Sequence, residues 1–420
     1  MTKSDSNEAC RCMFPPIAMW IVLLVFYIYQ FIARSAFPTV LTDQYMKFFG
    51  LDAKGVGTLA SCYYFVYTFA QIPVGILIDK CSIRLIGTLA TATCAIGILI
   101  FIATSNFYVA GFGQMLVGLG SAFAFISTLK IIVNWFPPEK NAIMTSLTMS
   151  FGCMGPVVAG PSVAVIVNHF EWRNVILIFG ILGLVLAAAV WIIVRDKENE
   201  QHESHEEISL IQSLKIIVTS PQALILSLFI MMLYAPLSAL GDLWGVPFMK
   251  RMYSCGAETA ALINNMIYIG MVFGCPFFAH LSNIMNSFKK PMILGTVICT
   301  IAFGVALFCN VPMWMMFIVF LIVGFGCGAM LSYSLAAFLF PSSMNATVNG
   351  FINMASMISG VILQPLIGYV MDTCWNGEME NGIKVYQVSD FKMGFLAVFG
   401  ALVLGILSAF LVKDRAPQEK

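Results

Sequence analysis

The chain has 420 residues, of which 60% are hydrophobic and only 10% are charged, a composition far outside the range of soluble globular proteins. The 22 Lys and Arg residues nearly balance the 21 Asp and Glu residues, so the formal net charge is +1. This balance excludes a basic surface for nucleic acids. We therefore expect a protein of the lipid bilayer with no nucleic-acid partner.

The chain begins with the polar segment MTKSDSNEACRCMFPP, and a long apolar run follows directly. This run is too long for the hydrophobic part of a signal peptide and lacks a small-residue cleavage site, so we expect it to remain as the first membrane span. Runs of about twenty apolar residues are long enough to cross a bilayer as helices. Twelve occur, near residues 15–38, 56–78, 85–105, 108–133, 142–168, 174–194, 221–249, 259–282, 291–310, 313–339, 346–371 and 392–412.

The distribution of Lys and Arg predicts the orientation, because basic residues are enriched in cytoplasmic segments. With the N-terminus inside, thirteen basic residues fall in inner segments, seven in outer segments and two within spans. We therefore expect both termini in the cytoplasm, in the inner membrane of a bacterium.

The longest charged interruption, RDKENEQHESHEEISLIQSLK, separates the sixth and seventh runs. It divides the chain into an N-terminal bundle (1–194), a cytoplasmic linker (195–220) and a C-terminal bundle (221–420). The linker contains His202 and His205, but nothing there enforces the geometry of a metal site, so we interpret it as solvated.

An internal repeat supports this division. The fourth run contains VGLGSAFAF from Val117, and the tenth contains VGFGCGAML from Val323. Gly118 and Gly324 are 206 residues apart, and Pro137 and Pro341 are 204 apart. Two homologous six-helix bundles predict a cavity between them, in which a solute is exposed to each side in turn.

The segment GILIDKCSIR resembles the loop signature between the second and third helices of the major facilitator superfamily. Gly75, Asp79, Lys80 and Arg84 match that signature, whereas Ser82 stands where the family usually has glycine. The resemblance implies a gating role: a charge network at the inner face that latches the two halves in the outward-open state. Alternatively, Asp79 caps a turn and Arg84 reaches the lipid headgroups.

Further segments point to narrower groups of the superfamily. MGPVVAGP in the fifth run is similar to the Gly-Pro kink of exchangers. NWFPPEKNA and GDLWGVPF resemble a bacterial branch that includes phagosomal nutrient transporters of intracellular pathogens. The second resemblance implies uptake of amino acids or nucleosides.

Ionisable residues within the spans are the candidate substrate ligands, because charges are costly in lipid and usually face a cavity or a partner. Arg34, Lys130 and Asp242 are the three such residues that stand out. Tyr27, Gln30 and Arg34 recur at i, i+3 and i+7, which predicts one polar helix face toward a cavity. Lys130 lies near the inner end of its span, where it could instead extend to the interface.

Asp242 precedes Pro247 in the seventh run much as Arg34 precedes Pro38 in the first. Because these runs are symmetry mates, we expect the two charges to face each other across the outer part of the cavity. One interpretation is a salt bridge that closes an outer gate. The other is a divided site in which Arg34 binds a carboxylate and Asp242 an ammonium, with Trp244 as an aromatic wall. The sequence does not distinguish the gate from the divided site.

The expected function is secondary active transport of a small polar solute, foremost an amino acid, with or without a coupled proton, by a monomer. YQFIARSAFP also resembles the first helix of organic-phosphate and organic-anion antiporters, which keeps such exchange as an alternative. A siderophore or drug exporter and a membrane solute sensor are further alternatives. We expect no enzyme, cofactor or metal site, because the sequence shows no catalytic constellation or ligand cluster. The twelve cysteines include no CxxC pair, so we expect packing residues rather than disulfides.

Overall fold

The computed structural model describes residues 15–196, 210–340, 345–380 and 382–414. Some helical residues are described by their backbone alone, among them Gly75, Asp79 and Lys80. His202 and His205, in the predicted linker, lie outside the described residues.

The N-terminal half begins with one continuous helical run that has a π-helical middle. Asp52 and Asn106 cap the helices that follow them by accepting backbone N–H bonds, and Gly50 ends its helix in the left-handed region, at φ +63°. The elements are α2 (Pro16–Phe31), η1 (Ile32–Ala36), α3 (Phe37–Val40), α4 (Thr42–Phe49), α5 (Ala53–Lys80), α6 (Ile83–Ala103), α7 (Phe107–Trp135), α8 (Pro138–Ile166) and α9 (Trp172–Ile193).

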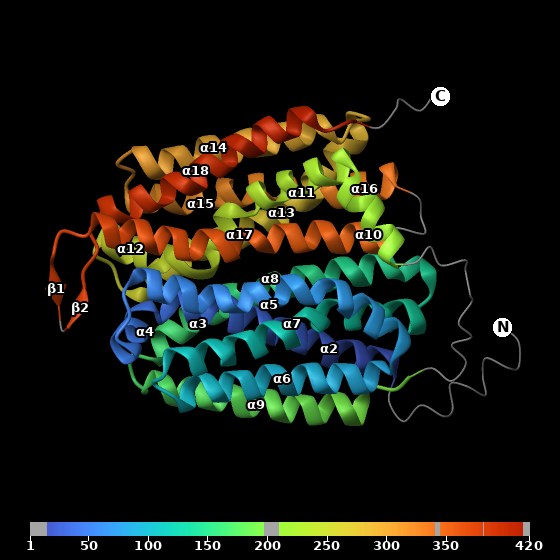
Figure 1. Ribbon diagram of the computed structural model, residues 1–420, viewed down its shortest axis with the longest axis horizontal. Helices are drawn as coiled ribbons and strands as arrows, with labels where there is room; N and C mark the ends of the chain where they lie inside the picture. Colours follow the sequence, from blue (N-terminus) through green and yellow to red (C-terminus); the bar gives the residue numbers. More distant parts are fainter. Residues whose placement is uncertain (1–14, 197–209, 341–344, 381, 415–420) are drawn as a thin grey trace, which may run out of the picture.

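The C-terminal half begins with α10 (Leu210–Thr219), which lies in the predicted linker, and then follows a similar order with a short β-hairpin before its last helix. Its other elements are α11 (Pro221–Leu233), η2 (Leu237–Trp244), α12 (Gly245–Tyr253), α13 (Ala257–Ile284), α14 (Lys289–Phe308), α15 (Met313–Cys327), α16 (Ser332–Leu339), α17 (Asn345–Cys374), β1 (Met379–Glu380), β2 (Ile383–Lys384) and α18 (Val388–Leu411). We call the end that carries β1 and β2 the hairpin end, and the opposite one the α10 end (Figure 1).

The expectation of an all-α membrane protein is confirmed. In the described ranges, eleven helical runs are long and apolar enough to cross a bilayer. The 28-residue α5 is a further helix of spanning length, and it contains three tyrosines, Tyr63, Tyr64 and Tyr67.

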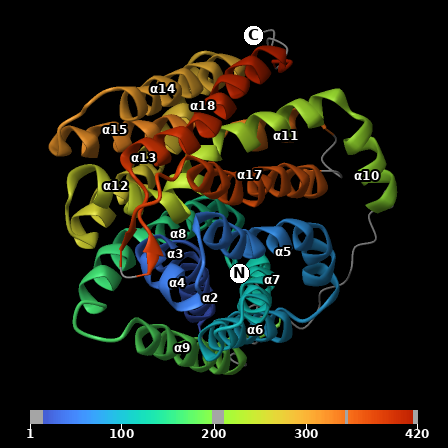
Figure 2. The same cartoon turned by 60° about the vertical axis from the view of Figure 1, so that its left-hand side comes forward.

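The halves form two side-by-side bundles, with α5 and α8 of the first facing α17 and α13 of the second (Figures 1 and 2). The predicted repeat is visible in the packing of its glycines. A Cβ on Gly118 would lie 2.3 Å from the carbonyl oxygen of Tyr63, and a Cβ on Gly324 would lie 1.9 Å from that of Ile267. Each glycine thus permits the same close helix contact in its own bundle.

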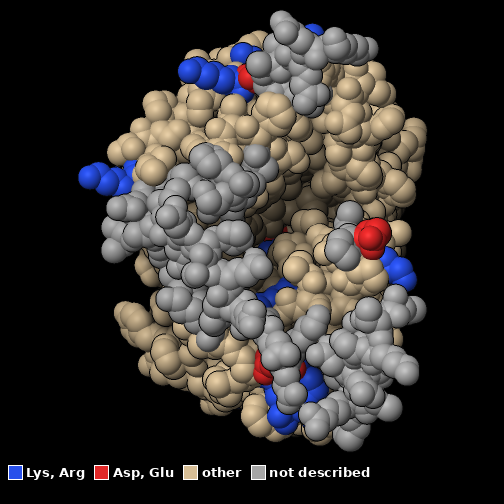
Figure 3. All heavy atoms as spheres, turned by 90° about the vertical axis from the view of Figure 1, so that its right-hand side faces the viewer, with Lys and Arg blue, Asp and Glu red and all other residues tan. Residues whose placement is uncertain are grey.

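The bundles are in close contact at the hairpin end. A Cβ on Gly57 would lie 2.3 Å from the Gln364 carbonyl oxygen, so α5 and α17 approach so closely that no larger residue fits there. Lys250 pairs with Asp43 across the same end. From the α10 end, a hollow is visible between the upper and lower halves of the molecule (Figure 3). The conformation is therefore closed at the hairpin end and open toward the α10 end.

Candidate functional site

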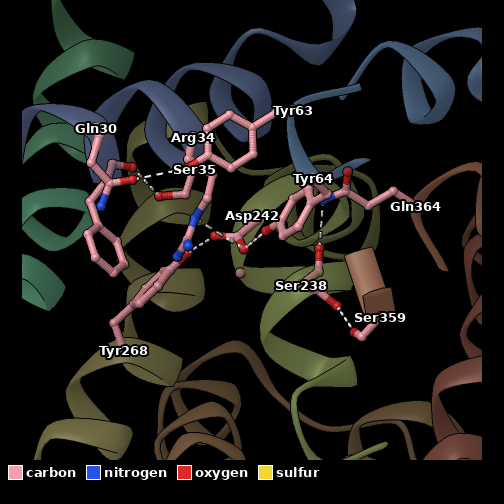
Figure 4. Close-up of polar contacts among 12 residues, drawn as sticks. Gln30, Arg34, Ser35, Tyr63, Tyr64, Ser238, Asp242, Tyr268, Ser359 and Gln364 are labelled. Atoms are coloured by element: carbon pink, nitrogen blue, oxygen red, sulfur yellow. Dashed lines mark hydrogen bonds and ion pairs between the residues drawn. The ribbon is translucent and has the colours of Figure 1, made fainter. Parts of the chain in front are cut away.

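Two π-helical segments face each other between the bundles, and each holds one of the predicted charges. Arg34 lies in η1 and Asp242 in η2. The Arg34 Nε atom is 3.7 Å from the Asp242 Oδ2 atom, and the two residues are 5% and 0% exposed (Figure 4). π-Helical turns often occur at functional sites, because they displace side chains from the regular helical positions.

Two tyrosines hold the carboxylate of Asp242. The Tyr268 hydroxyl, from α13, donates to Oδ1 at 2.5 Å, and the Tyr64 hydroxyl, from α5, donates to Oδ2 (Figure 4). A buried carboxylate is tolerated at bilayer depth only with such partners. Asp242 is therefore satisfied by two phenols and a guanidinium.

Arg34 is less completely satisfied. Its guanidinium carbon lies 4.3 Å from the centre of the Phe31 ring, a cation–π contact. Its Nε and Nη2 atoms are buried and make no hydrogen bond to any described residue. A guanidinium can donate five N–H bonds in a planar fork, so Arg34 retains capacity for a planar acceptor such as a carboxylate.

The predicted polar face of the first helix lies beside this pair. The Tyr63 hydroxyl donates to Gln30 Oε1 at 3.0 Å, within the N-terminal bundle. Tyr27 is buried, and its ring lies against Gly152 of α8, where a Cβ would be 2.3 Å away. Tyr27, Gln30 and Arg34 are thus neighbours in a buried, partly polar region.

The structure does not bring Trp244 or Lys130 to the charge pair. The Trp244 indole donates to the Gln364 carbonyl at 3.1 Å and packs against Phe391, facing α17 and α18. The Lys130 ammonium donates to the carbonyl of Ile78, about 20 Å along α5 from Tyr64 at 1.5 Å per residue. Lys130 therefore lies at the α10 end.

Of the predicted gating residues, only Arg84 has a described side chain. Its guanidinium carbon lies 3.9 Å from the centre of the Trp191 ring, and its Nε donates to the Trp191 carbonyl at 2.7 Å. Both contacts are within the N-terminal bundle. Gly75, Asp79 and Lys80 form the last turns of α5, and the latch remains a prediction.

Sequence reasoning missed Tyr64 and Tyr268, although the signal was available. They are 204 residues apart, the same spacing as Pro137 and Pro341, so they are mates in the repeat. It also missed a polar chain behind Asp242, in which Gln364 Nε2 donates to the Ser238 carbonyl at 2.9 Å and the Ser238 and Ser359 hydroxyls are 2.5 Å apart.

Two helical bundles that close over a charged pair at one end and open at the other form the architecture of a membrane transporter. The chain belongs to the Major Facilitator Superfamily, whose model matches residues 19–364. This membership implies twelve membrane helices in two bundles, as the sequence predicts, and the fold and relatives are those of transporters rather than enzymes.

Similar proteins from bacteria cover most of the chain. The uncharacterized transporter YybO of Bacillus subtilis is 23% identical over 382 residues, which are 85% of this chain and 87% of YybO. The probable galactarate/D-glucarate transporter GudP of Escherichia coli is 22% identical over 419 residues, with 87% and 89% covered. Among shorter matches, the hexuronate transporter of B. subtilis is 24% identical over 157 residues, with 36% of each chain covered.

Two solved structures show the same fold. A bacterial homologue of the human lysosomal transporter Spinster, in an inward-facing, unoccupied conformation, has a TM-score of 0.77 at 17% identity, with 94% of this chain and 96% of that chain covered. The nucleoside transporter NupG has a TM-score of 0.71 at 17% identity, with 94% and 99% covered.

Proposed function

We propose that this transporter moves a small solute whose carboxylate binds Arg34. The observation that carries the proposal is the pair of Arg34 nitrogens, Nε and Nη2, that are buried between the bundles without a hydrogen bond to a described residue. An incompletely paired guanidinium at bilayer depth is costly unless an anion completes it. A substrate carboxylate supplies two coplanar oxygens, which match the guanidinium fork.

The surroundings of Asp242 favour a gate over a divided site. Asp242 already accepts hydrogen bonds from Tyr64 and Tyr268 and lies beside Arg34. Each carboxylate oxygen of Asp242 thus already has a phenol donor, and a substrate ammonium would compete with these groups and with Arg34. In our proposal, Asp242 neutralises Arg34 while the hairpin end is closed and the site is empty, and the substrate carboxylate competes with Asp242 for Arg34.

The substrate class is a carboxylate next to other polar groups. An amino acid, the solute expected from the sequence, fits this description, and so does a sugar acid. The names of similar transporters, for galactarate, D-glucarate and hexuronate, favour the sugar acid. An organic phosphate is disfavoured, because it would bring two negative charges on one group beside Asp242, whereas each carboxylate of a sugar acid carries one.

We further propose symport with a proton carried by Asp242. When a substrate carboxylate occupies Arg34, protonation of Asp242 would remove the repulsion between the two carboxylates. In the same proposal the protein is a monomer in a bacterial inner membrane, with the α10 end cytoplasmic, as the Lys and Arg distribution predicts.

The test is a thermal-shift screen of the purified protein against amino acids, sugar acids, nucleosides and sugar phosphates. A ligand that raises the melting temperature is then tested on Arg34→Lys, Arg34→Ala and Arg173→Ala. Arg173 is a matched control, because it contacts Ile102 and Phe48 of its own bundle.

We expect stabilisation by amino acids or by sugar acids, and the responding group identifies the class. Binding should weaken about tenfold to a hundredfold in Arg34→Ala, from the loss of a charge-assisted hydrogen bond, and less in Arg34→Lys. Native affinity in Arg34→Ala, or stabilisation by nucleosides alone, would reject the proposal.

A further inference from the structure

The two tyrosines that hold Asp242 belong to opposite bundles. Tyr268 is in α13, in the same bundle as Asp242, whereas Tyr64 is in α5, in the N-terminal bundle. The bond from Tyr268 can persist when the bundles move relative to each other. The bond from Tyr64 crosses the interface, so it has to break when the bundles separate at the hairpin end.

The ring of Tyr64 is also seated against the opposite bundle. A Cβ on Gly360 of α17 would lie 2.6 Å from the ring, closer than any real contact, so the glycine makes room for it. Tyr64 is 1% exposed. Its neighbour Tyr63 donates instead to Gln30 of its own bundle. Two adjacent tyrosines thus serve different purposes, one within a bundle and one between bundles.

We infer that Tyr64 is a positioning residue for the transport cycle: its hydroxyl holds Asp242 next to Arg34, and its ring docks on Gly360, only while the hairpin end is closed. Tyr64 therefore sets the equilibrium between the two conformations of the transporter. The inference rests on the proposed alternating function of the Arg34–Asp242 pair, but it does not depend on the substrate.

The experiment measures that equilibrium directly, without substrate. Spin labels are attached to cysteines introduced at Lys47 in α4 and Glu258 in α13, both exposed and in different bundles, after the exposed native cysteines are replaced by serine. Double electron–electron resonance then resolves a short distance for the closed hairpin end and a longer one for the open end. The variants are Tyr64→Phe, Tyr268→Phe and Tyr63→Phe.

In Tyr64→Phe the ratio of long to short distances should rise about tenfold, the effect of one hydrogen bond to a charged acceptor present in one state only. Tyr268→Phe and Tyr63→Phe remove bonds that exist in both states, so the ratio should stay near that of the native protein. In an Asp242→Asn background, where the charged acceptor is absent, Tyr64→Phe should have little further effect.

Gly360→Ala tests the ring contact independently. The added methyl group should disfavour the closed hairpin end and shift the ratio in the same direction as Tyr64→Phe. An unchanged ratio in both Tyr64→Phe and Gly360→Ala overturns the inference, as does an equal shift in Tyr64→Phe and Tyr268→Phe. Because no substrate is present, failure here leaves carboxylate binding by Arg34 to be judged by its own screen.

Discussion

At the scale of single residues, the central feature is a buried ion pair whose partners are satisfied unequally. Asp242 has two phenol donors, whereas two nitrogens of Arg34 have no hydrogen bond to the described chain. Removing one partner of a buried pair usually costs about 3–5 kcal/mol, because the other charge is left uncompensated. The pair therefore contributes to stability and to binding, and the two contributions can be measured separately.

Exchanging the charges, Arg34→Asp with Asp242→Arg, separates the contribution of the ion pair to stability from its contribution to substrate binding. We expect each single variant, Arg34→Asp or Asp242→Arg, to lower the melting temperature and the exchange to recover part of it, since Tyr64 and Tyr268 can accept as well as donate. The exchanged protein should not regain substrate affinity, because its guanidinium lies in the other bundle. The measurement is a double-mutant cycle of melting temperature and affinity. Near-native affinity in the exchanged protein would make the pair a gate alone, with no substrate bound by Arg34.

At the scale of elements, helix α5 is capped by the opposite bundle. The Asp372 carboxylate, at the end of α17, accepts from the Lys54 backbone N–H at 2.8 Å and from the Tyr386 hydroxyl at 2.5 Å, and it pairs with Lys384 at 3.0 Å. The Tyr386 oxygen in turn accepts from the Ala53 N–H at 3.0 Å. A carboxylate at a helix N-terminus is stabilised by the backbone N–H groups and the helix dipole.

Tyr386 is suited to this position. Burial, together with its hydrogen bond to Asp372, raises the pKa of the Tyr386 hydroxyl above its usual value near 10. The hydroxyl therefore keeps its proton at physiological pH and continues to donate to Asp372.

Replacing Asp372 by asparagine keeps its size and removes its charge. We expect this change to weaken closure of the hairpin end by about 1–3 kcal/mol, the cost of losing bonds to a charged group. Hydrogen exchange of the Ala53 and Lys54 amides should accelerate accordingly. Asp43→Asn serves as the control, since it removes the pair with Lys250 at the same end but none of the hydrogen bonds that Asp372 and Tyr386 make to the start of α5. Equal exchange rates in all three proteins would exclude Asp372 as a cap.

A proline shapes the second contact between bundles. Pro161 in α8 has no N–H, so the Val157 carbonyl loses its helical donor. Asn265 of α13 donates its amide to that carbonyl at 2.8 Å. Pro161 and Pro365 of α17 are 204 residues apart, the spacing of the repeat. The contact between α8 and α13 and the contact between α5 and α17 therefore each contain a proline at the equivalent position.

At the scale of the whole molecule, transport requires a second conformation, closed at the α10 end. In the present one Arg84 is stacked on Trp191 of its own bundle and donates to the Trp191 carbonyl. The latch implied by the Gly75–Arg84 segment would form when the α10 end closes.

The variant Asp79→Asn tests this latch. Because the charge is needed only in the conformation closed at the α10 end, we expect the rate of transport into proteoliposomes to fall strongly. Substrate binding and membrane insertion should be retained. Glu139→Gln is the control, as Glu139 is an exposed acid at the start of α8. Native flux in Asp79→Asn would leave Asp79 as a turn residue.

Much of the architecture was predictable from the sequence, because the bilayer imposes a one-dimensional constraint. A span must be about twenty apolar residues long, and the runs near 15–38 and 221–249 correspond to helical segments that contain Arg34 and Asp242. The repeat predicted that these two charges would face each other. Its spacing of 204 residues also pairs Tyr64 with Tyr268.

What only the tertiary structure decided is which partner each polar group takes. Trp244 and Asp242 are two residues apart, yet the indole donates to Gln364 of α17 while the carboxylate binds Tyr64 and Tyr268. The π-helical turns that aim these side chains leave no periodic signal in an apolar run. Nor does hydrophobic length reveal which end is closed, because both conformations bury the same spans in the same lipid. Hydrogen bonds and glycine contacts between the bundles determine which end is closed. These contacts exist only in the folded protein, where the two halves are packed together.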